Sequence, residues 1–240
     1  NILLPKFLES DIVVYATPLF HRTFTAPLKA FIERTLPVAL PYLEADNERT
    51  NHPIRVKVPN FVLLSVAGFP ELEEFQLLSD LAQYNFNSNH SRLLAEIYRP
   101  SSQVLTNPLY EEATNDILDA VSQAGQEIIQ DGKVASQTMA RITQPLQEKA
   151  NMIKVSNMYW QTCIDKKITP KQFEKNSLIP HQKTVEDMML LMSQGIKKSK
   201  SKTIEAKIQF ILSGEQTGAF YIDIDKGNIS SELGETGLPT

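Results

Sequence analysis

Aromatic side chains occur in two turn-like stretches that each follow an apolar run. "YATPLFHRTFT" carries Phe20 and His21, and "VAGFPE" carries Phe69. Backbone amides at 17–23 and 67–69, next to flat side chains, suit a planar ligand with polar edges, such as a flavin. A purely structural loop does not need this combination, although Phe20 and Phe69 could instead fill a core. The pattern leaves both alternatives open.

The other reactive side chains form no recognisable catalytic or metal-binding pattern. His21 is a lone loop histidine, which is more often exposed or hydrogen-bonded than catalytic. The other three histidines have no metal-ligand spacing with it. Glu71 is better explained as a carboxylate at a helix start than as a general base. The sequence has no nucleophile with a recognisable base, no Walker loop and no G-x-G-x-x-G. We therefore predict neither a catalytic side chain nor a metal ligand.

Net charge, cysteine count and apolar runs limit the partners and the location that can be expected for this chain. The formal net charge of -4 provides no basic surface for nucleic acid, and we interpret the lysine cluster at 197–202 as a solvated linker. The single Cys163 excludes an internal disulfide and an all-cysteine metal or iron-sulfur site within this chain. No apolar run approaches the roughly 18 residues that span a bilayer, and no signal peptide opens the sequence. We expect no nucleic acid, no membrane span and a cytoplasmic location.

Strand and helix patterns alternate three times from the N-terminus. The apolar β-branched run at 11–16 is typical of an inner parallel strand that is buried on both faces. Thr25 can cap the next helix, which should end by Pro37. This alternation predicts an α/β fold with a parallel sheet covered by helices. The further expected elements are a buried strand that opens the stretch 60–71, a strand at 92–99, a helix from Glu71 to about Phe86 with Leu72, Phe75, Leu78 and Leu81 inside, and a helix over 110–130.

Residues 37–57 form a long, polar segment that proline interrupts repeatedly. Loops of this length are usually functional or oligomeric, so we predict that this segment contributes to a subunit interface. The chain also opens on an amphipathic segment that looks like a helix entered partway.

The C-terminal half changes its pattern after two further helices, expected at 136–143 and 145–164. A polar stretch at 165–183 reads as a linker, and a short amphipathic segment with Val185, Met188, Met189 and Met192 follows. Alternating apolar residues then predict an antiparallel meander. Ile208, Phe210 and Leu212 share one face, as do Phe220, Ile222 and Ile224. The expected domains are 1–164, a linker at 165–183 and 184–240.

Residues 1–130 resemble a known family. "SDIVVYATPLFHRTFTAPLKAFIERTLP" and "LLSVAGFPE" are similar to the third strand with its flavin loop, and to the next strand and loop, of the NADPH-dependent FMN reductase and iron-sulfur flavoprotein branch of the flavodoxin-like fold. The resemblance implies a three-layer flavodoxin-like fold, in which helices cover both faces of a parallel sheet. It also implies FMN as cofactor and NAD(P)H as electron donor. It implies FMN contacts at Thr17, Pro18, Leu19, Phe20 and His21 on one side of the ring and Ala67, Gly68, Phe69 and Pro70 along its edge.

This resemblance also carries expectations about what lies upstream. The family's first strand, its FMN phosphate loop and the cysteine motif of some members would precede Asn1, which leaves an iron-sulfur cluster undecided. Phe20 stands where relatives often have tyrosine, so a hydroxyl contact would be missing. "KTIEAKIQFILSGEQTGAFYIDIDKGNISSELGE" resembles the opening meander of a sterol-carrier-protein type domain, which implies an apolar tunnel for a lipid-like ligand.

Two functions from different classes follow. The first is an FMN-dependent oxidoreductase that passes electrons to a small-molecule or protein acceptor and is homo-oligomeric in the complete protein. The alternative is a non-enzymatic carrier of an apolar ligand on a flavodoxin-like scaffold. A structural or oligomerising domain with degenerate loops is a third reading.

Overall fold

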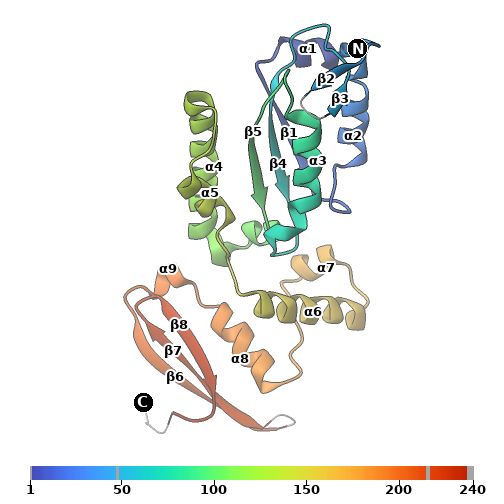
Figure 1. Cartoon of the computed structure of the whole chain (residues 1–240). Coiled ribbons are helices and arrows are strands. Elements are labelled where there is room, and N and C mark those ends of the chain that lie inside the picture. The colour runs from blue at the N-terminus through green and yellow to red at the C-terminus, as the bar shows by residue number, and fades with distance from the viewer. Residues whose placement is uncertain (1, 47–48, 215–216, 237–240) are drawn as a thin grey trace. The chain divides into compact units, whose positions relative to one another are not determined.

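The chain folds into two compact units (Figure 1). The structure, a computed structural model, describes residues 2–46, 49–214 and 217–236. Unit 1 comprises 1–106 and 113–145, and unit 2 comprises 107–112 and 146–240. In the described part of the chain, no helix is both long and apolar enough to cross a membrane.

Unit 1 is built on a parallel three-stranded sheet with the order β1-β4-β5. Helices interleave with these strands along the chain and lie on both sides of the sheet (Figure 1). The predicted α/β class is therefore confirmed. The elements are α1 (Leu3–Glu9), β1 (Ile12–Pro18), α2 (Ala26–Glu33), β4 (Asn60–Val66), α3 (Gln76–Phe86), β5 (Leu93–Arg99), α4 (Glu111–Asp131) and α5 (Ser136–Thr143).

The strand β4 divides two buried clusters because its side chains alternate between the faces of the sheet. Leu63 packs with Phe75 and Leu78 on the α3 side, and Val62 packs with Ile97 and the small residues of α4 on the other side. One residue that was expected inside, Leu72, is exposed. It is the first residue of the 3-10 turn Leu72–Phe75, which precedes α3.

The strand β1 is covered on one face only. Tyr15 and Thr17 are buried on the α3 side, whereas Val14 is 56% exposed on the opposite face. Among the described residues, β4 is the only strand that pairs with β1, so β1 lies at an edge of the sheet. Burial of β1 on both faces is therefore not observed among the described residues, where no second strand pairs with it, and the inner position that the resemblance implies for the complete fold stays a prediction.

The segment 37–57 contains a small β-hairpin. Its strands are β2 (Glu44–Asp46) and β3 (Arg49–Asn51), and the 3-10 turn Leu36–Val38 precedes them; 47–48 lie outside the described residues. The His90 side chain lies 2.8 Å from Glu44 and ties the hairpin to the loop before β5. Tyr42 and Leu43 are exposed. The predicted role of this segment in a subunit interface stays a prediction.

Unit 2 contains four helices and an antiparallel sheet within its described residues. The helix α7 falls inside the segment 165–183, so the irregular structure expected there was wrong, while its role as a linker stays a prediction. A capping box between Thr169 and Gln172 starts α7, and Phe173 packs on Tyr159 of α6. The elements are α6 (Lys149–Lys166), α7 (Pro170–Lys175), α8 (Val185–Gln194), α9 (Lys198–Ser201), β6 (Glu205–Leu212), β7 (Gly218–Asp225) and β8 (Asn228–Leu233).

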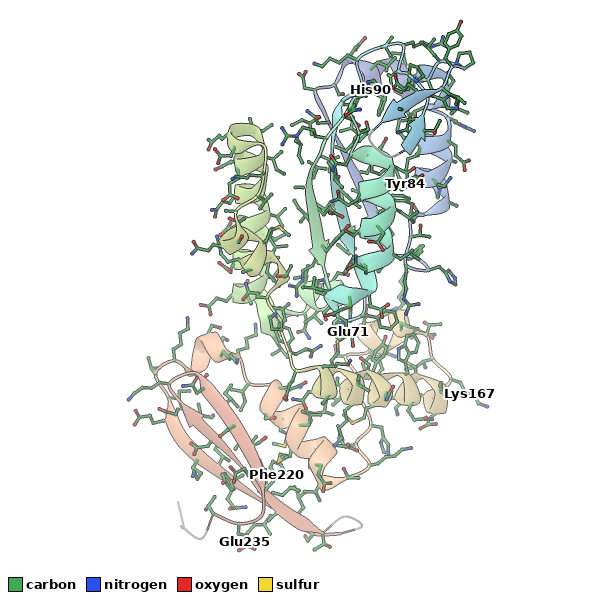
Figure 2. The ribbon with its side chains drawn as sticks, viewed as in Figure 1. Glu71, Tyr84, His90, Lys167, Phe220 and Glu235 are labelled. Carbon is green, nitrogen blue, oxygen red and sulfur yellow. The ribbon has the colours of Figure 1, made fainter. Side chains whose placement is uncertain are left out.

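The C-terminal sheet confirms the predicted meander, with strand order β6-β7-β8. Lys226 and Gly227 both have positive φ, as a tight two-residue hairpin requires. Phe220, which Figure 2 labels in this sheet, is fully buried. Its ring stacks on that of Phe210. The predicted domain boundaries stay predictions. Contacts within the chain assign α6 to unit 2, although its residues lie mostly in the predicted first domain, 1–164. Residues 215–216 of the first predicted turn lie outside the described residues.

Candidate functional site

Both predicted aromatic loops leave the same end of the unit 1 sheet. The strands β1 and β4 run parallel and in register, with Thr17 beside Ser65 and Pro18 beside Val66. The Leu19 amide then donates to the Val66 carbonyl at 2.9 Å. Figure 2 shows Glu71, just after the second loop, at the end of the sheet toward which the strand arrows point. The two predicted sets of site residues are therefore neighbours at the carboxyl end, where open parallel sheets bind ligands.

The first loop contains a tight turn with unusual backbone geometry. The Thr23 amide donates to the Phe20 carbonyl at 3.1 Å, and His21 and Arg22 between them have φ of 48° and 61°. Such left-handed positions usually hold glycine or asparagine, because a Cβ atom is strained there. Backbone strain of this kind is concentrated at functional sites. The turn presents the side chains of Phe20 and His21 to solvent.

Two side-chain contacts hold this turn. The Arg22 guanidinium forms an ion pair with Glu74, with Nε 2.9 Å from Oε2, and so connects the first loop to the segment after the second. The buried Thr17 hydroxyl accepts a hydrogen bond from the Thr25 amide at 3.2 Å. Thr25 stands at the N-cap position of α2 but makes no capping hydrogen bond with its own side chain. Thr17 thus closes the loop in place of the predicted cap.

The second loop is exposed at its tip and pinned at its base. Ala67 is buried, and its amide donates to the Arg99 carbonyl at 3.0 Å, so it is not open to a ligand. Gly68 and Phe69 are exposed, and Pro70 is half-buried. Within the described stretches 17–23 and 67–69, the amides of His21, Arg22, Gly68 and Phe69 have no backbone hydrogen-bond partner, whereas Phe20 and Thr23 form an isolated antiparallel bridge.

A third loop, which sequence reasoning missed, braces the second. The Ser101 amide donates to the Phe69 carbonyl and the Ser102 amide to the Ala67 carbonyl, each at 2.9 Å. The Gln103 side chain donates to the Gly68 carbonyl at 3.0 Å. The sequence contained a signal for this third loop. The polar stretch "PSSQ" directly follows the third predicted strand, which must end at the same edge of a parallel sheet as the other two.

The two aromatic rings do not fill a core. Phe20 and Phe69 are each 61% exposed, whereas Leu19 between them and the sheet packs on the buried cluster. Exposed aromatic side chains at a sheet end, beside amides that lack partners, offer flat apolar surface and polar contacts to the same ligand. Among the described residues, neither ring is buried, and the role of Phe20 and Phe69 in binding stays a prediction.

Two buried polar side chains, Arg99 and Ser65, lie near these strand ends. Arg99 is 5% exposed, and its Nη1 donates to the carbonyls of Ile142 and Gln144 at the end of α5, both at 2.8 Å. Burial lowers the pKa of the Arg99 guanidinium. The Ser65 hydroxyl is fully buried without a partner among the described residues. In the described part of the chain, no cluster of three histidine, cysteine or acidic residues could hold a metal ion.

In unit 2, the apolar face of the meander is covered unevenly. The helix α8 packs through Val185, Met188 and Met189 on the cluster around Phe220 and Ile222. It lies over β7 and β8, and Ile208 on the same face of β6 remains partly exposed. The opposite face of the sheet carries an ion pair of 3.0 Å between Lys207 and Asp223, together with the exposed Ile211. An apolar ligand would therefore meet this unit beside Ile208.

Comparisons with protein-family models, with curated proteins and with solved structures find no match to this chain.

Proposed function

We propose that this chain is part of an FMN-dependent oxidoreductase whose flavin ring lies against the paired loops 17–23 and 67–70. The observation that carries the proposal is the exposure of Phe20 and Phe69 at neighbouring strand ends, next to backbone amides without partners. FMN would carry electrons from a donor such as NAD(P)H to a small-molecule or protein acceptor. The absence of a general acid or base pattern fits chemistry that the cofactor supplies.

Each loop would have a separate task. Phe20 and Phe69 would supply the flat apolar surface, and the open amides of Gly68 and Phe69 would face the polar edge of the ring. The Arg22–Glu74 ion pair would hold the two loops at a constant separation. The cytoplasmic location and the iron-sulfur cluster, which would lie upstream, stay predictions.

Flavin titration of the 240-residue chain tests this proposal, followed by quenching of flavin fluorescence. These loops offer ring contacts, and the phosphate loop that the resemblance implies would lie upstream. Riboflavin and FMN should therefore bind weakly and alike, within less than about a tenfold difference. Phe69→Leu and Phe20→Leu should each weaken both ligands about three- to tenfold, because they remove a flat ring contact. Tyr84→Leu removes an equally exposed ring from α3 and should change nothing.

Gly68→Val provides an independent test of the second loop. A Cβ atom at Gly68 would meet only the Gln103 side chain, at 3.7 Å, and the backbone there does not have positive φ. The variant should therefore fold normally and still obstruct a flavin. Unchanged titration curves for Gly68→Val and both phenylalanine variants would contradict the site.

A carrier function in unit 2 is the second candidate, and the partly exposed Ile208 on the apolar face of β6 favours it. A fluorescent fatty acid should bind, and Ile208→Asp should abolish that binding. Ile211→Asp provides the control, because Ile211 is exposed on the opposite face of the same strand. Equal binding by both variants would contradict a ligand on the apolar face.

A further inference from the structure

The guanidinium of Arg99 is buried at the carboxyl end of β5. The side chain is 5% exposed. Because it follows Ile97 by two residues, it points to the same face of the sheet, where Ile97 and Ile142 belong to the buried cluster of α4 and α5. Among the described residues, no other lysine or arginine is buried. Described residues already enclose this guanidinium, so its burial does not depend on any further segment of chain.

Hydrogen bonds reach only one of the three guanidinium nitrogens. Nη1 donates to the carbonyls of Ile142 and Gln144 at the end of α5. Nε and Nη2 are buried and make no hydrogen bond among the described residues. No described carboxylate forms an ion pair with Arg99. Asp116, which lies near the same helix end, is bound instead by Arg141 and by the Gln144 side chain.

The positive charge of Arg99 is therefore compensated only in part. Arginine stays protonated in proteins, even though burial lowers the pKa of this guanidinium. The carbonyls at a helix end together carry about half of a negative charge. In surroundings of low polarity, the remaining positive charge acts over a longer distance than a charge that water and salt screen.

The backbone of the same residue holds the second loop of the candidate site. Arg99 pairs with Val66 in the register of β4 and β5, and its carbonyl accepts a hydrogen bond from the Ala67 amide at 3.0 Å. Because adjacent strands lie about 4.8 Å apart, the guanidinium lies on the order of 10 Å from the backbone of the loop at 67–70. A buried cation thus lies directly behind this loop.

We propose that Arg99 gives the candidate site at 17–23 and 67–70 a preference for negatively charged planar ligands over neutral ones. The preference rests on the proposed function, because the ligand concerned is the flavin that these loops would hold. The ring of oxidised riboflavin is neutral, and its reduction by two electrons with uptake of one proton gives an anion. Arg99 would favour that anion through its electric field, without contact.

Coulomb's law gives the size of the expected effect. Two unit charges on the order of 10 Å apart, at an effective dielectric constant of about 20, change an equilibrium constant by about tenfold. Since the helix end compensates part of the charge, Arg99 should favour the reduced anion over the oxidised ring by about three- to tenfold. The exposed side chains of Arg22 and Glu73 contribute less, because water and salt screen them.

Dissociation constants of oxidised and reduced riboflavin test the proposal. Anaerobic equilibrium dialysis of the 240-residue chain at mildly alkaline pH, with dithionite as reductant, measures both. Arg99→Gln removes the charge but keeps an amide donor for the α5 carbonyls, so it should lower the preference for the anion about three- to tenfold. Arg99→Lys keeps both a charge and a donor and should retain most of the preference. Circular dichroism checks that both variants fold.

Two changes of condition act as controls on the unsubstituted chain. At mildly acidic pH, the reduced ring takes up a second proton and becomes neutral, so the preference should shrink. In about 1 M salt the preference should persist, because salt screens buried charges much less than exposed ones. A preference that this salt concentration removes would belong to the exposed Arg22 and would contradict Arg99 as its source.

The two variants also separate charge from structure. An unchanged preference in Arg99→Gln overturns the proposal. An equal loss in Arg99→Gln and Arg99→Lys overturns it too, because hydrogen bonding and packing would then be the cause. If neither form of riboflavin binds to the unsubstituted chain, the proposed function fails, and a measurement without flavin decides the role of Arg99.

A thiol introduced into the second loop provides that measurement. Phe69→Cys, in a Cys163→Ser background, places a thiol at an exposed position, and the pH dependence of its alkylation by iodoacetamide gives its pKa. Adding Arg99→Gln should raise this pKa by about 0.5, since a nearby cation stabilises the thiolate. Adding Arg99→Lys should leave the pKa unchanged.

A second thiol position tests whether the effect is local. Tyr84 is exposed on α3 and lies away from Glu71, the residue that follows the second loop (Figure 2). The thiol of Tyr84→Cys should therefore not respond to Arg99→Gln. A Phe69→Cys thiol whose pKa is the same with and without Arg99→Gln contradicts the proposal, and so does an equal change at both positions.

Discussion

The neighbouring strands β1 and β4 have similar sequences and very different surroundings. Both are seven residues long, apolar and parallel, and they pair in register along their whole length. β4 is inserted between two strands and covered on both faces, while β1 is covered on one face and paired on one edge. An apolar run therefore predicts that a strand forms. How many sides of it are buried depends on which other elements are present.

The same contrast applies to two buried hydroxyls at paired positions of these strands. Thr17 of β1 accepts a hydrogen bond from the Thr25 amide, whereas Ser65 of β4 has no partner among the described residues. The edge strand uses its hydroxyl to shape the candidate site. In the inner strand β4, the Ser65 hydroxyl is buried and makes no hydrogen bond among the described residues.

The largest expected effect is the loss of core packing at β4. Leu63→Ala should lower the free energy of unfolding of unit 1 by about 3–4 kcal/mol. Leu63 is fully buried, so the substitution leaves a cavity that neither solvent nor the surrounding side chains fill completely. Val14→Ala is the matched change at β1 and should cost less than about 1 kcal/mol. Urea unfolding followed by circular dichroism, at concentrations where the chain is monomeric, measures both. An equal loss of unfolding free energy in the two variants would contradict the difference in burial between β4 and β1.

An intermediate effect is expected at Thr17. Thr17→Val removes the acceptor of the Thr25 amide and should cost about 1–2 kcal/mol, because a part-buried donor then lacks its partner. Thr17→Ser keeps the oxygen and should recover most of this loss in the same urea experiment. If the proposed flavin site is correct, Thr17→Val should also weaken riboflavin binding and Thr17→Ser should not. A stable Thr17→Val chain would show that the hydroxyl does not hold the first loop.

The smallest effect is expected at Ser65. Ser65→Ala removes a buried hydroxyl with no partner and should leave stability unchanged, or raise it by up to about 1 kcal/mol. Thermal unfolding beside the unsubstituted chain measures the difference. A clear destabilisation would mean that the Ser65 hydroxyl is hydrogen-bonded in solution, and the contrast with Thr17 would then disappear.

Much of unit 1 and the C-terminal sheet could be predicted from residue patterns. Local propensity and periodicity specify the strands 60–66 and 92–99, the helix with Phe75 and Leu78 inside, and the meander that turns at Gly227. Each depends on short-range steric preferences or on a burial pattern that repeats within one element. The placement of both aromatic loops at one sheet end also follows, because parallel strands share their direction.

Other features were decided only by tertiary contacts. The periodicity of 11–16 cannot report that the outer edge of β1 has no paired strand in the described part of the chain, because burial depends on elements distant in sequence. The left-handed turn at His21 and Arg22 has no glycine or asparagine signal. It is associated instead with the Phe20–Thr23 hydrogen bond and with the ion pair that Arg22 forms with Glu74, 52 residues further along the chain. Sequence alone specified which segments become strands and helices, and tertiary packing decided which of their side chains reach solvent, because that depends on neighbours that no local pattern encodes.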